Sequence, residues 1–182
     1  MKIETTPIAD LLIVEPDVYR DARGFFEESY NEARYTDAGI TARFVQDNYS
    51  MSSYGVVRGL HFQKAPWTQA KLVTCIAGCV LDVAVDLRKG SPTYGQWFGV
   101  ELSETNHRQL FIPRGFAHGF SVLSPTALFA YKCDNLYHKE AEGGIYLNDS
   151  DLNIDWRVPV ADRILSDKDQ QYPLLRDAHI EF

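Results

Sequence analysis

Two segments of the sequence carry an imidazole among polar and turn-forming residues, at spacings that can build a site. Gln46–Ser50 leads into Arg58–Gln63, which contains His61, and Phe111–Phe120 contains His118. An imidazole has an ordinary pKa of about 6.5, so it can exchange a proton near neutral pH. The chain has no Gly-rich phosphate loop, no Gly-x-Ser-x-Gly elbow and no pair of Cys-x-x-Cys motifs. These absences argue against covalent serine or cysteine catalysis.

The second segment contains the pattern Pro-x-Gly-x-x-His, from Pro113 to His118, which resembles the second motif of the cupin β-barrels. In metal-binding cupins the first motif adds a His-x-His pair and a Glu, which together form a mixed imidazole and carboxylate site. Here the first motif reads His61-Phe62-Gln63, and no Glu lies between Gln63 and Gly78. We therefore expect no bound metal.

These motifs must be held by β-structure, because short apolar runs separated by Gly, Pro and Ser turns dominate residues 56–132. Cys79–Leu87 alternates apolar residues with the more polar Asp82 and Asp86, the period of a strand. Many short strands with such turns are typical of a sandwich or barrel. The predicted strands are Lys71–Ile76, Cys79–Leu87, Gln96–Leu102, Gln109–Ile112, Phe116–Leu123 and Ala127–Lys132.

Helical signals are short. Asn31–Ala38 and the segment after Asp162 each predict a turn or two of helix. The last forty residues contain polar and acidic runs, such as Asn148–Asp151, which predict solvated loops. With 182 residues and no internal repeat, we expect one all-β domain over residues 1–182.

The composition limits the partners. A formal net charge of -7 argues against non-specific binding to nucleic acid, although a few cations in a cleft can still hold a small anion. No apolar run is long enough to span a membrane, and the first residues do not form a signal peptide. Three cysteines, an odd number, suit buried thiols in a reducing compartment. We expect a cytoplasmic protein.

Taken together, the motifs resemble those of the dTDP-4-dehydrorhamnose 3,5-epimerase family, a group of metal-free cupins. The resemblance runs from near Asp21 to Asp169 and rests on several ordered pieces. These are Asp21–Glu28, Gln46–Asn48, Arg58–Gln63, Gln69–Val73, Asp82–Arg88, Pro113–Phe120, Tyr131–Lys132 and Leu165–Asp169.

The resemblance implies a cupin-type jelly-roll β-barrel with short peripheral helices, and an isomerase that needs no cofactor. Family members epimerise a 4-keto sugar nucleotide, a dTDP-sugar, by removing and returning protons at the carbons beside the ketone. By resemblance, His61 is the base and Tyr131 the acid on the opposite side. Asp169 pairs with the base, and Lys71 stabilises the enolate oxygen and contacts the sugar.

The remaining matches imply contacts with the substrate. Arg23, Arg58 and Lys168 suit a diphosphate, and Tyr137 can stack on the thymine. Polar contacts to the sugar and base are expected from Glu28, Gln46, Asn48, His118 and Glu142. The family's N-terminal strands cross to a neighbouring subunit, so a homodimer is expected, with Arg23 and Glu28 serving the partner's site. His107, His138 and His179 have no matching role and are expected on the surface.

Two alternatives remain open on the sequence. A sibling enzyme would be an epimerase of a single carbon or a keto-isomerase of another deoxysugar nucleotide. A protein of a different class would be a cupin that binds a sugar without catalysis. Tyr131 and Lys71 argue against the isomerase, and a retained base with an opposed acid argues against the binding protein.

Overall fold

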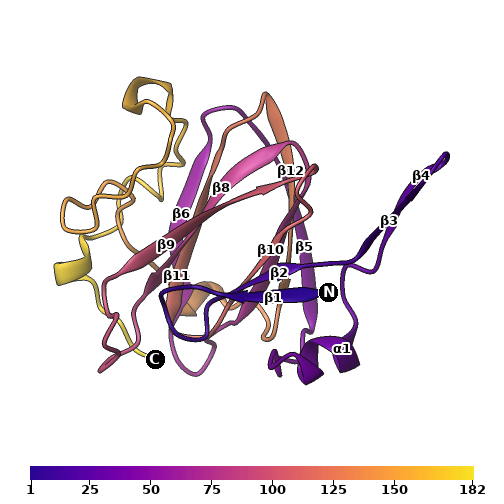
Figure 1. Cartoon of the computed structure of the whole chain (residues 1–182). Helices are drawn as coiled ribbons and strands as arrows, with labels where there is room; N and C mark the ends of the chain where they lie inside the picture. The colour runs from indigo at the N-terminus through magenta and orange to yellow at the C-terminus, as the bar shows by residue number, and fades with distance from the viewer.

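Two antiparallel β-sheets face each other and enclose the core in the computed structural model, which describes residues 1–182 (Figure 1). The six-stranded sheet has the order β1-β2-β10-β7-β12-β5, with β1 Lys2–Thr5, β2 Leu12–Glu15, β10 Gln109–Ile112, β7 Lys71–Ala77, β12 Thr126–Cys133 and β5 Gln46–Ser53. The five-stranded sheet has the order β13-β6-β11-β8-β9, with β13 Glu142–Gly144, β6 Val57–Gln63, β11 Phe116–Val122, β8 Cys79–Asp86 and β9 Trp97–Ser103. The all-β jelly-roll prediction is confirmed.

The six predicted strands are β7 to β12, with ends that differ from the prediction by one residue at most. Sequence patterns did not predict β5 or β6. In β5 only Tyr49 and Met51 are large and apolar, and both are exposed at the edge of the sheet. In β6, Gly59 interrupts the apolar pattern. Both strands carry predicted site residues, so function there overrides the usual strand composition.

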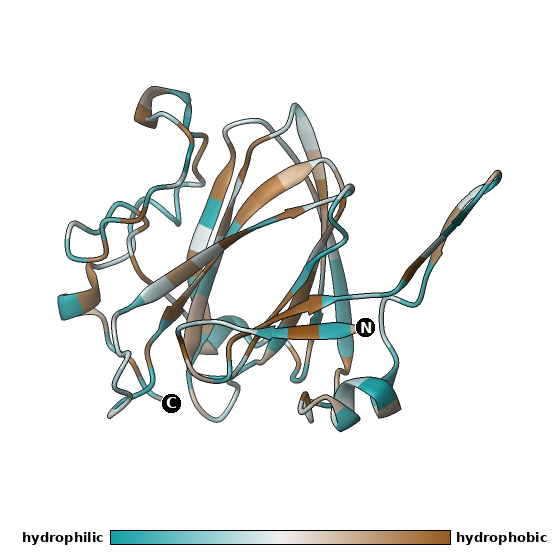
Figure 2. Cartoon of the chain, viewed as in Figure 1, coloured by the Kyte–Doolittle hydropathy of each residue, from teal (hydrophilic) through white to brown (hydrophobic).

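The core between the two sheets is one apolar cluster. In Figure 2, brown segments lie on strands of both sheets. The cluster combines Val73, Leu110 and Phe129 of one sheet with Val100 and Phe120 of the other. Burying side chains from both sheets fixes their separation at about 10 Å. The alternation of β8 then sends Leu81, Val83 and Val85 to a second core outside the barrel and Asp82 into the barrel interior.

The C-terminal segment covers the outer face of the five-stranded sheet: its polar runs are mostly exposed loops, as predicted, but the apolar residues between them are buried, which was not predicted. Ile145, Leu147 and Trp156 are buried against the outward side chains of β6 and β8. Asp149 is also buried, because its carboxylate accepts hydrogen bonds from the backbone of Asp151, Leu152 and Leu175. The polar runs supply the turns between these apolar anchors.

The one α-helix, α1 (Glu32–Asp37), begins where the sequence predicted, since the Asn31 side chain accepts a hydrogen bond from the Arg34 N–H as an N-cap. The helix expected after Asp162 is only a short 3-10 turn, η3 (Leu175–Asp177). Two more 3-10 turns are η1 (Lys139–Ala141) and η2 (Val160–Asp162). No helix has the length and apolar character needed to cross a membrane.

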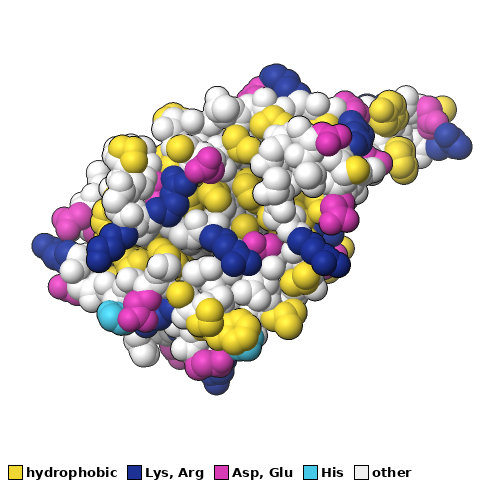
Figure 3. Space-filling view, turned by 90° about the horizontal axis from the view of Figure 1, so that it is seen from below, with side chains coloured by type: hydrophobic (Ala, Val, Ile, Leu, Met, Phe, Trp, Pro, Cys, Tyr) yellow, Lys and Arg dark blue, Asp and Glu magenta, His cyan; other side chains and the backbone are white.

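A two-stranded ribbon, β3 (Val18–Asp21) with β4 (Gly24–Glu27), projects from the barrel and pairs with no other strand (Figure 1). Hydrophobic side chains are exposed on it, as Figure 3 shows for the face seen from below; Tyr19, Phe25 and Phe26 are each more than half exposed. An apolar ribbon held in water indicates a surface that another molecule covers.

The prediction that His107 is a surface residue was wrong. Its side chain lies at the root of the ribbon, where Glu27 and Phe25 cover it. His138 is partly covered by Trp67, which stacks on its ring, while His179 is exposed as expected.

We expect Asp149→Ala to lower the free energy of unfolding by about 1–3 kcal/mol, because it leaves buried backbone N–H groups without an acceptor. Urea denaturation followed by fluorescence measures the loss. Asp155→Ala is the matched control, since Asp155 accepts one backbone N–H but is exposed. Equal stability of the two variants would contradict the account of the C-terminal segment.

Candidate active site

A cavity of about 300 Å³ opens into one end of the barrel between the two sheets. Seven of the predicted site residues line it. They are Gln46, Asn48, His61, Lys71, Tyr131, Tyr137 and Glu142. Because β6 belongs to one sheet and β5, β7 and β12 to the other, the residues of these strands face each other across the cavity.

His61, on β6, forms the best-defined contact of the site. Its Nε2 donates a hydrogen bond to Oδ1 of Asp169 over 2.6 Å. Asp169 is only 2% exposed, and the Ser166 hydroxyl accepts a hydrogen bond from its backbone N–H. Burial acts to raise the pKa of Asp169, but the hydrogen bond and charge of His61 outweigh it and hold that pKa below its ordinary value. The carboxylate therefore stays ionised and orients the imidazole.

Tyr131 and Lys71 lie on the opposite wall. The Lys71 Nζ is 5.8 Å from the centre of the Tyr131 ring. Burial raises the pKa of the Tyr131 phenol, an effect that the charge of Arg58 partly offsets. Burial also lowers the pKa of the Lys71 ammonium. The phenol is therefore kept in its acid form, beside a cation that is poorly solvated and available to an anion.

A second imidazole–carboxylate pair lies in the interior. His118 on β11 is the register partner of His61, and its Nε2 is 2.8 Å from Oδ2 of Asp82 on β8. Burial lowers the pKa of His118, although Asp82 opposes that shift. Both side chains are buried, and His118 also stacks on Phe129. No role was predicted for Asp82 from the sequence, although its strand pattern placed it on the more polar face.

At the mouth of the cavity one carboxylate holds two predicted substrate contacts. Glu142 accepts a hydrogen bond from Lys168 Nζ over 2.6 Å and another from the Tyr137 hydroxyl over 2.9 Å. Burial acts to raise the pKa of Glu142, and these two hydrogen bonds bring it below its ordinary value. Glu142 thus connects β13 to the loop that carries Lys168 and Asp169.

Besides His118, Lys168 and Asp169, which are described above, three more predicted site residues do not line the cavity. Arg58 is exposed on β6 and donates a hydrogen bond to Ser52. Arg23 lies at the tip of the ribbon and contacts Asp21, while Glu28 pairs with Arg34 near α1. Within one chain, the structure does not bring Arg23 or Glu28 to the cavity.

The cavity is also lined by four residues for which no role was predicted from the sequence: Phe62, Gln63, Gln69 and Cys133. Gln63 is buried, accepts a hydrogen bond from the His138 N–H and donates to the Trp67 carbonyl, so it joins two loops at the mouth. Cys133 pairs in register with Lys71. Gln63 and Gln69 belonged to the matching motifs, whereas Cys133 gave no signal beyond an apolar strand.

The fold and the cavity define a cupin-type jelly-roll barrel with an imidazole–carboxylate pair facing a phenol and an ammonium. A family model described as dTDP-4-dehydrorhamnose 3,5-epimerase matches residues 5–177. The chain therefore belongs to the dTDP-4-dehydrorhamnose 3,5-epimerase family, which confirms the resemblance seen in its motifs.

Individual relatives agree. A dTDP-4-dehydrorhamnose 3,5-epimerase of Shigella flexneri is 55% identical over 170 residues, covering 93% of each chain. The crystal structure of dTDP-6-deoxy-D-glucose-3,5-epimerase from Legionella pneumophila in complex with dTDP-4-keto-L-rhamnose has a TM-score of 0.95 and 52% identity, covering 100% of this chain and 98% of that one. A less similar relative, the dTDP-4-dehydrorhamnose 3-epimerase of Streptomyces niveus, is 40% identical and covers 98% of this chain and 86% of its own length.

We expect Lys71→Met to raise the free energy of unfolding by about 1 kcal/mol near neutral pH, because it removes a poorly solvated ammonium and keeps the apolar stem. A lowered pKa in the folded state opposes folding at any pH where the unfolded lysine is protonated. The gain should therefore shrink as the pH approaches 10.5, the ordinary lysine value.

Denaturation near neutral pH and again near pH 10.5 measures the change in the free energy of unfolding. Lys132→Met is the control, since Lys132 pairs with Asp47 at the surface. A variant less stable than the parent chain near neutral pH would show that Lys71 is not a destabilising group.

Proposed function

We propose that this chain inverts carbons 3 and 5 of dTDP-4-dehydro-6-deoxy-D-glucose to give dTDP-4-dehydro-L-rhamnose. The observation that carries the proposal is the His61–Asp169 pair on one wall of the cavity with Tyr131 on the other. Family membership and the ligand named for the Legionella pneumophila structure support the class of substrate.

The reaction needs a base and an acid on opposite faces of the sugar. His61 takes the proton from a carbon beside the ketone, and the electron pair of the broken C–H bond forms an enolate with its charge on the carbonyl oxygen. The Tyr131 hydroxyl then delivers a proton to the other face of that carbon, and the ketone re-forms. Protons exchanged with solvent restore the imidazole and the phenol before the second carbon reacts.

The neighbours of the pair supply the electrostatics. Asp169 orients His61 and stabilises the imidazolium that forms when the proton is taken. Lys71, whose ammonium has no carboxylate partner, stabilises the enolate oxygen. The raised pKa of Tyr131 keeps the phenol protonated until the enolate needs it.

The polar residues at the mouth are proposed to hold the nucleotide. Tyr137 stacks on the thymine, Arg58 and Lys168 face the diphosphate, and Glu142 fixes Tyr137 and Lys168 in place. Base and sugar contacts are proposed for Gln46, Asn48 and the buried His118. The Gln46 side chain donates a hydrogen bond to that of Asn48.

We further propose a homodimer in which each β3–β4 ribbon crosses to the other subunit. The exposed Tyr19, Phe25 and Phe26 would then be covered. Arg23, at the ribbon tip, and Glu28, near its base, would serve the partner's site, in keeping with their distance from the cavity of their own chain. The single domain is proposed to work in the cytoplasm, consistent with three unpaired cysteines.

The two alternatives are separated by one experiment. The protein is incubated with dTDP-4-dehydro-6-deoxy-D-glucose in deuterium oxide, and NMR locates the deuterium. We expect label at carbons 3 and 5, with inversion at both. Label at one carbon would identify a single-carbon epimerase, the activity that the Streptomyces niveus relative is named for. No label would identify a sugar-binding protein without catalysis.

In the same assay we expect His61→Asn to lower both exchange and turnover by about 10²–10⁴-fold, because no enolate forms without the base. Tyr131→Phe keeps the ring but removes the acid, so it should retain part of the exchange and lose most of the inversion. Inversion of both centres by Tyr131→Phe at the parent rate, or free exchange by His61→Asn, would refute the assignment of acid and base.

We also expect full activity without a metal or organic cofactor, since the first motif lacks the second imidazole and the Glu of metal-binding cupins. Activity is measured after exhaustive chelation and again after adding back divalent cations. Loss on chelation and recovery with one metal would overturn this expectation.

A further inference from the structure

A cluster of four side chains joins the barrel to the root of the ribbon, and none of the four lines the cavity that contains His61. His107 lies in the turn between β9 and β10, and its Nδ1 is 2.7 Å from Oε2 of Glu27 at the end of β4. Nη2 of Arg20, on β3, is 2.8 Å from the other ring nitrogen. The Phe25 ring meets the imidazole edge-on, with centroids 4.8 Å apart. One imidazole therefore contacts both strands of the ribbon.

The cluster is well ordered by its surroundings. The His107 and Glu27 side chains are only 9% and 14% exposed, unlike the rest of the ribbon. His107 has a φ of 55°, in the left-handed region of backbone conformation. This conformation is unfavourable by about 1 kcal/mol for most residues that carry a Cβ. The turn holds it there through the bond from the His107 N–H to the Ser103 carbonyl and through Asn106, whose side chain accepts from two backbone N–H groups.

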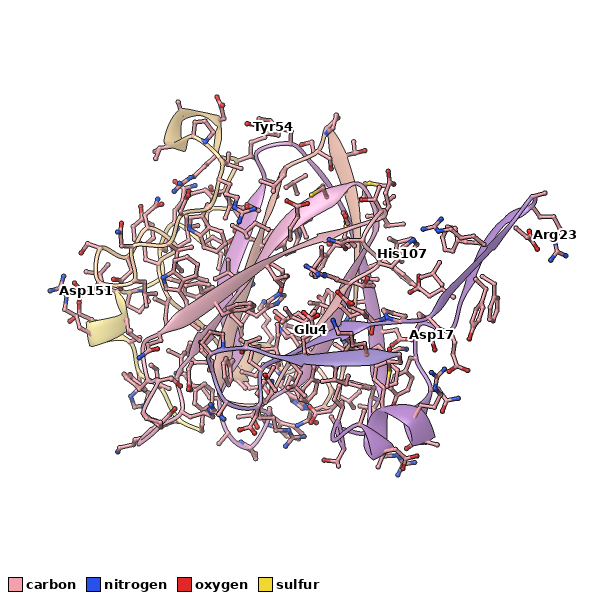
Figure 4. All side chains as sticks on the ribbon, viewed as in Figure 1. Glu4, Asp17, Arg23, Tyr54, His107 and Asp151 are labelled. Atoms are coloured by element: carbon pink, nitrogen blue, oxygen red, sulfur yellow. The ribbon has the colours of Figure 1, made fainter.

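Beyond this cluster nothing on the barrel holds the ribbon tip. Arg23 is 90% exposed, and its one charged partner is Asp21 of the same ribbon. The base is tied separately, because Arg34 pairs with both Asp17 and Glu28 at 2.8 Å. Figure 4 shows Asp17 and His107 near the root and Arg23 at the far end. The direction of the tip is therefore set at two points, Arg34 and His107.

We propose that His107 and Glu27 form a clamp that aims the ribbon, so that Arg23 reaches the diphosphate held in the partner subunit's cavity. This rests on the proposed function, in which the ribbon crosses to a second copy. His107 is then a positioning residue that touches no substrate. Its leverage is large: Arg23 lies four residues from Glu27, about 13 Å along a strand, so a tilt of roughly 10° at the root moves the tip by about 2 Å. Charge-assisted contacts to a phosphate tolerate about 0.5 Å.

The test is calorimetric titration of the full-length protein with dTDP. We expect His107→Ala to weaken binding about tenfold, with kcat at saturating substrate largely kept. In an Arg23→Ala background the same substitution should have no further effect, because the residue that the clamp aims is gone. Glu27→Ala removes the same contact from the ribbon, which pairs with no strand of the barrel, and should behave in the same way.

Matched variants separate the clamp from other effects. His107→Asn, which tolerates a positive φ and keeps a donor and an acceptor, should recover part of the affinity. His179→Ala, which removes an exposed imidazole paired with Glu181, should bind dTDP as the parent does. Sedimentation of each variant should show the mass of the parent assembly.

Each other outcome has a definite meaning. If His107→Ala weakens dTDP binding equally in the parent and in the Arg23→Ala background, the clamp is refuted and the proposed function is not. Dissociation of the His107→Ala assembly would have the same meaning. An Arg23→Ala variant with unchanged affinity for dTDP would overturn the proposed role of the ribbon, and the clamp with it.

Discussion

The hydrogen bond between His61 and Asp169 is the contact on which the rest of the site depends. It joins strand β6 to a loop more than a hundred residues later, and it places an ionised carboxylate where only 2% of the residue is exposed. Burying such a charge is unfavourable by several kcal/mol unless it is paired and hydrogen-bonded. The loop must therefore close against the barrel for the pair to form. The C-terminal segment makes this possible, because Ile145, Leu147 and Trp156 anchor the chain on the outer face of the same sheet.

The second constraint is the two-sheet barrel itself. Residues that face each other across its interior come from different sheets, so the His61 wall and the Tyr131–Lys71 wall are held apart by the same packing that forms the core. Burial then adjusts the chemistry, since it raises the pKa of Tyr131 and lowers that of Lys71. The same desolvation that makes these groups unfavourable for stability prepares them for proton transfer.

The sequence predicted the barrel well where local pattern decides structure. The alternation in β8 and the Gly and Pro turns located six strands closely, and the motifs identified the cavity residues His61, Tyr131 and Lys71. What it missed depends on contacts between distant segments. Asp82 meets its partner His118 only when β8 and β11 align. Asp149 is buried only when the C-terminal segment folds back over the sheet and Leu175 donates to it. The environment of His107 arises from the ribbon folding back on a turn 80 residues away, which no local pattern records.

The most direct test of the account is the protonation state of the two nitrogens of His61. If Nε2–H donates to Asp169, the neutral ring must leave Nδ1 unprotonated and free to act as the base. Nitrogen-15 NMR of the protein with labelled histidine, assigned by comparison with His61→Asn, reports the state of each nitrogen. We expect a protonated Nε2 and an unprotonated Nδ1 in the neutral imidazole. A proton on Nδ1 with Nε2 bare would contradict it, because the carboxylate would then orient no base toward the substrate.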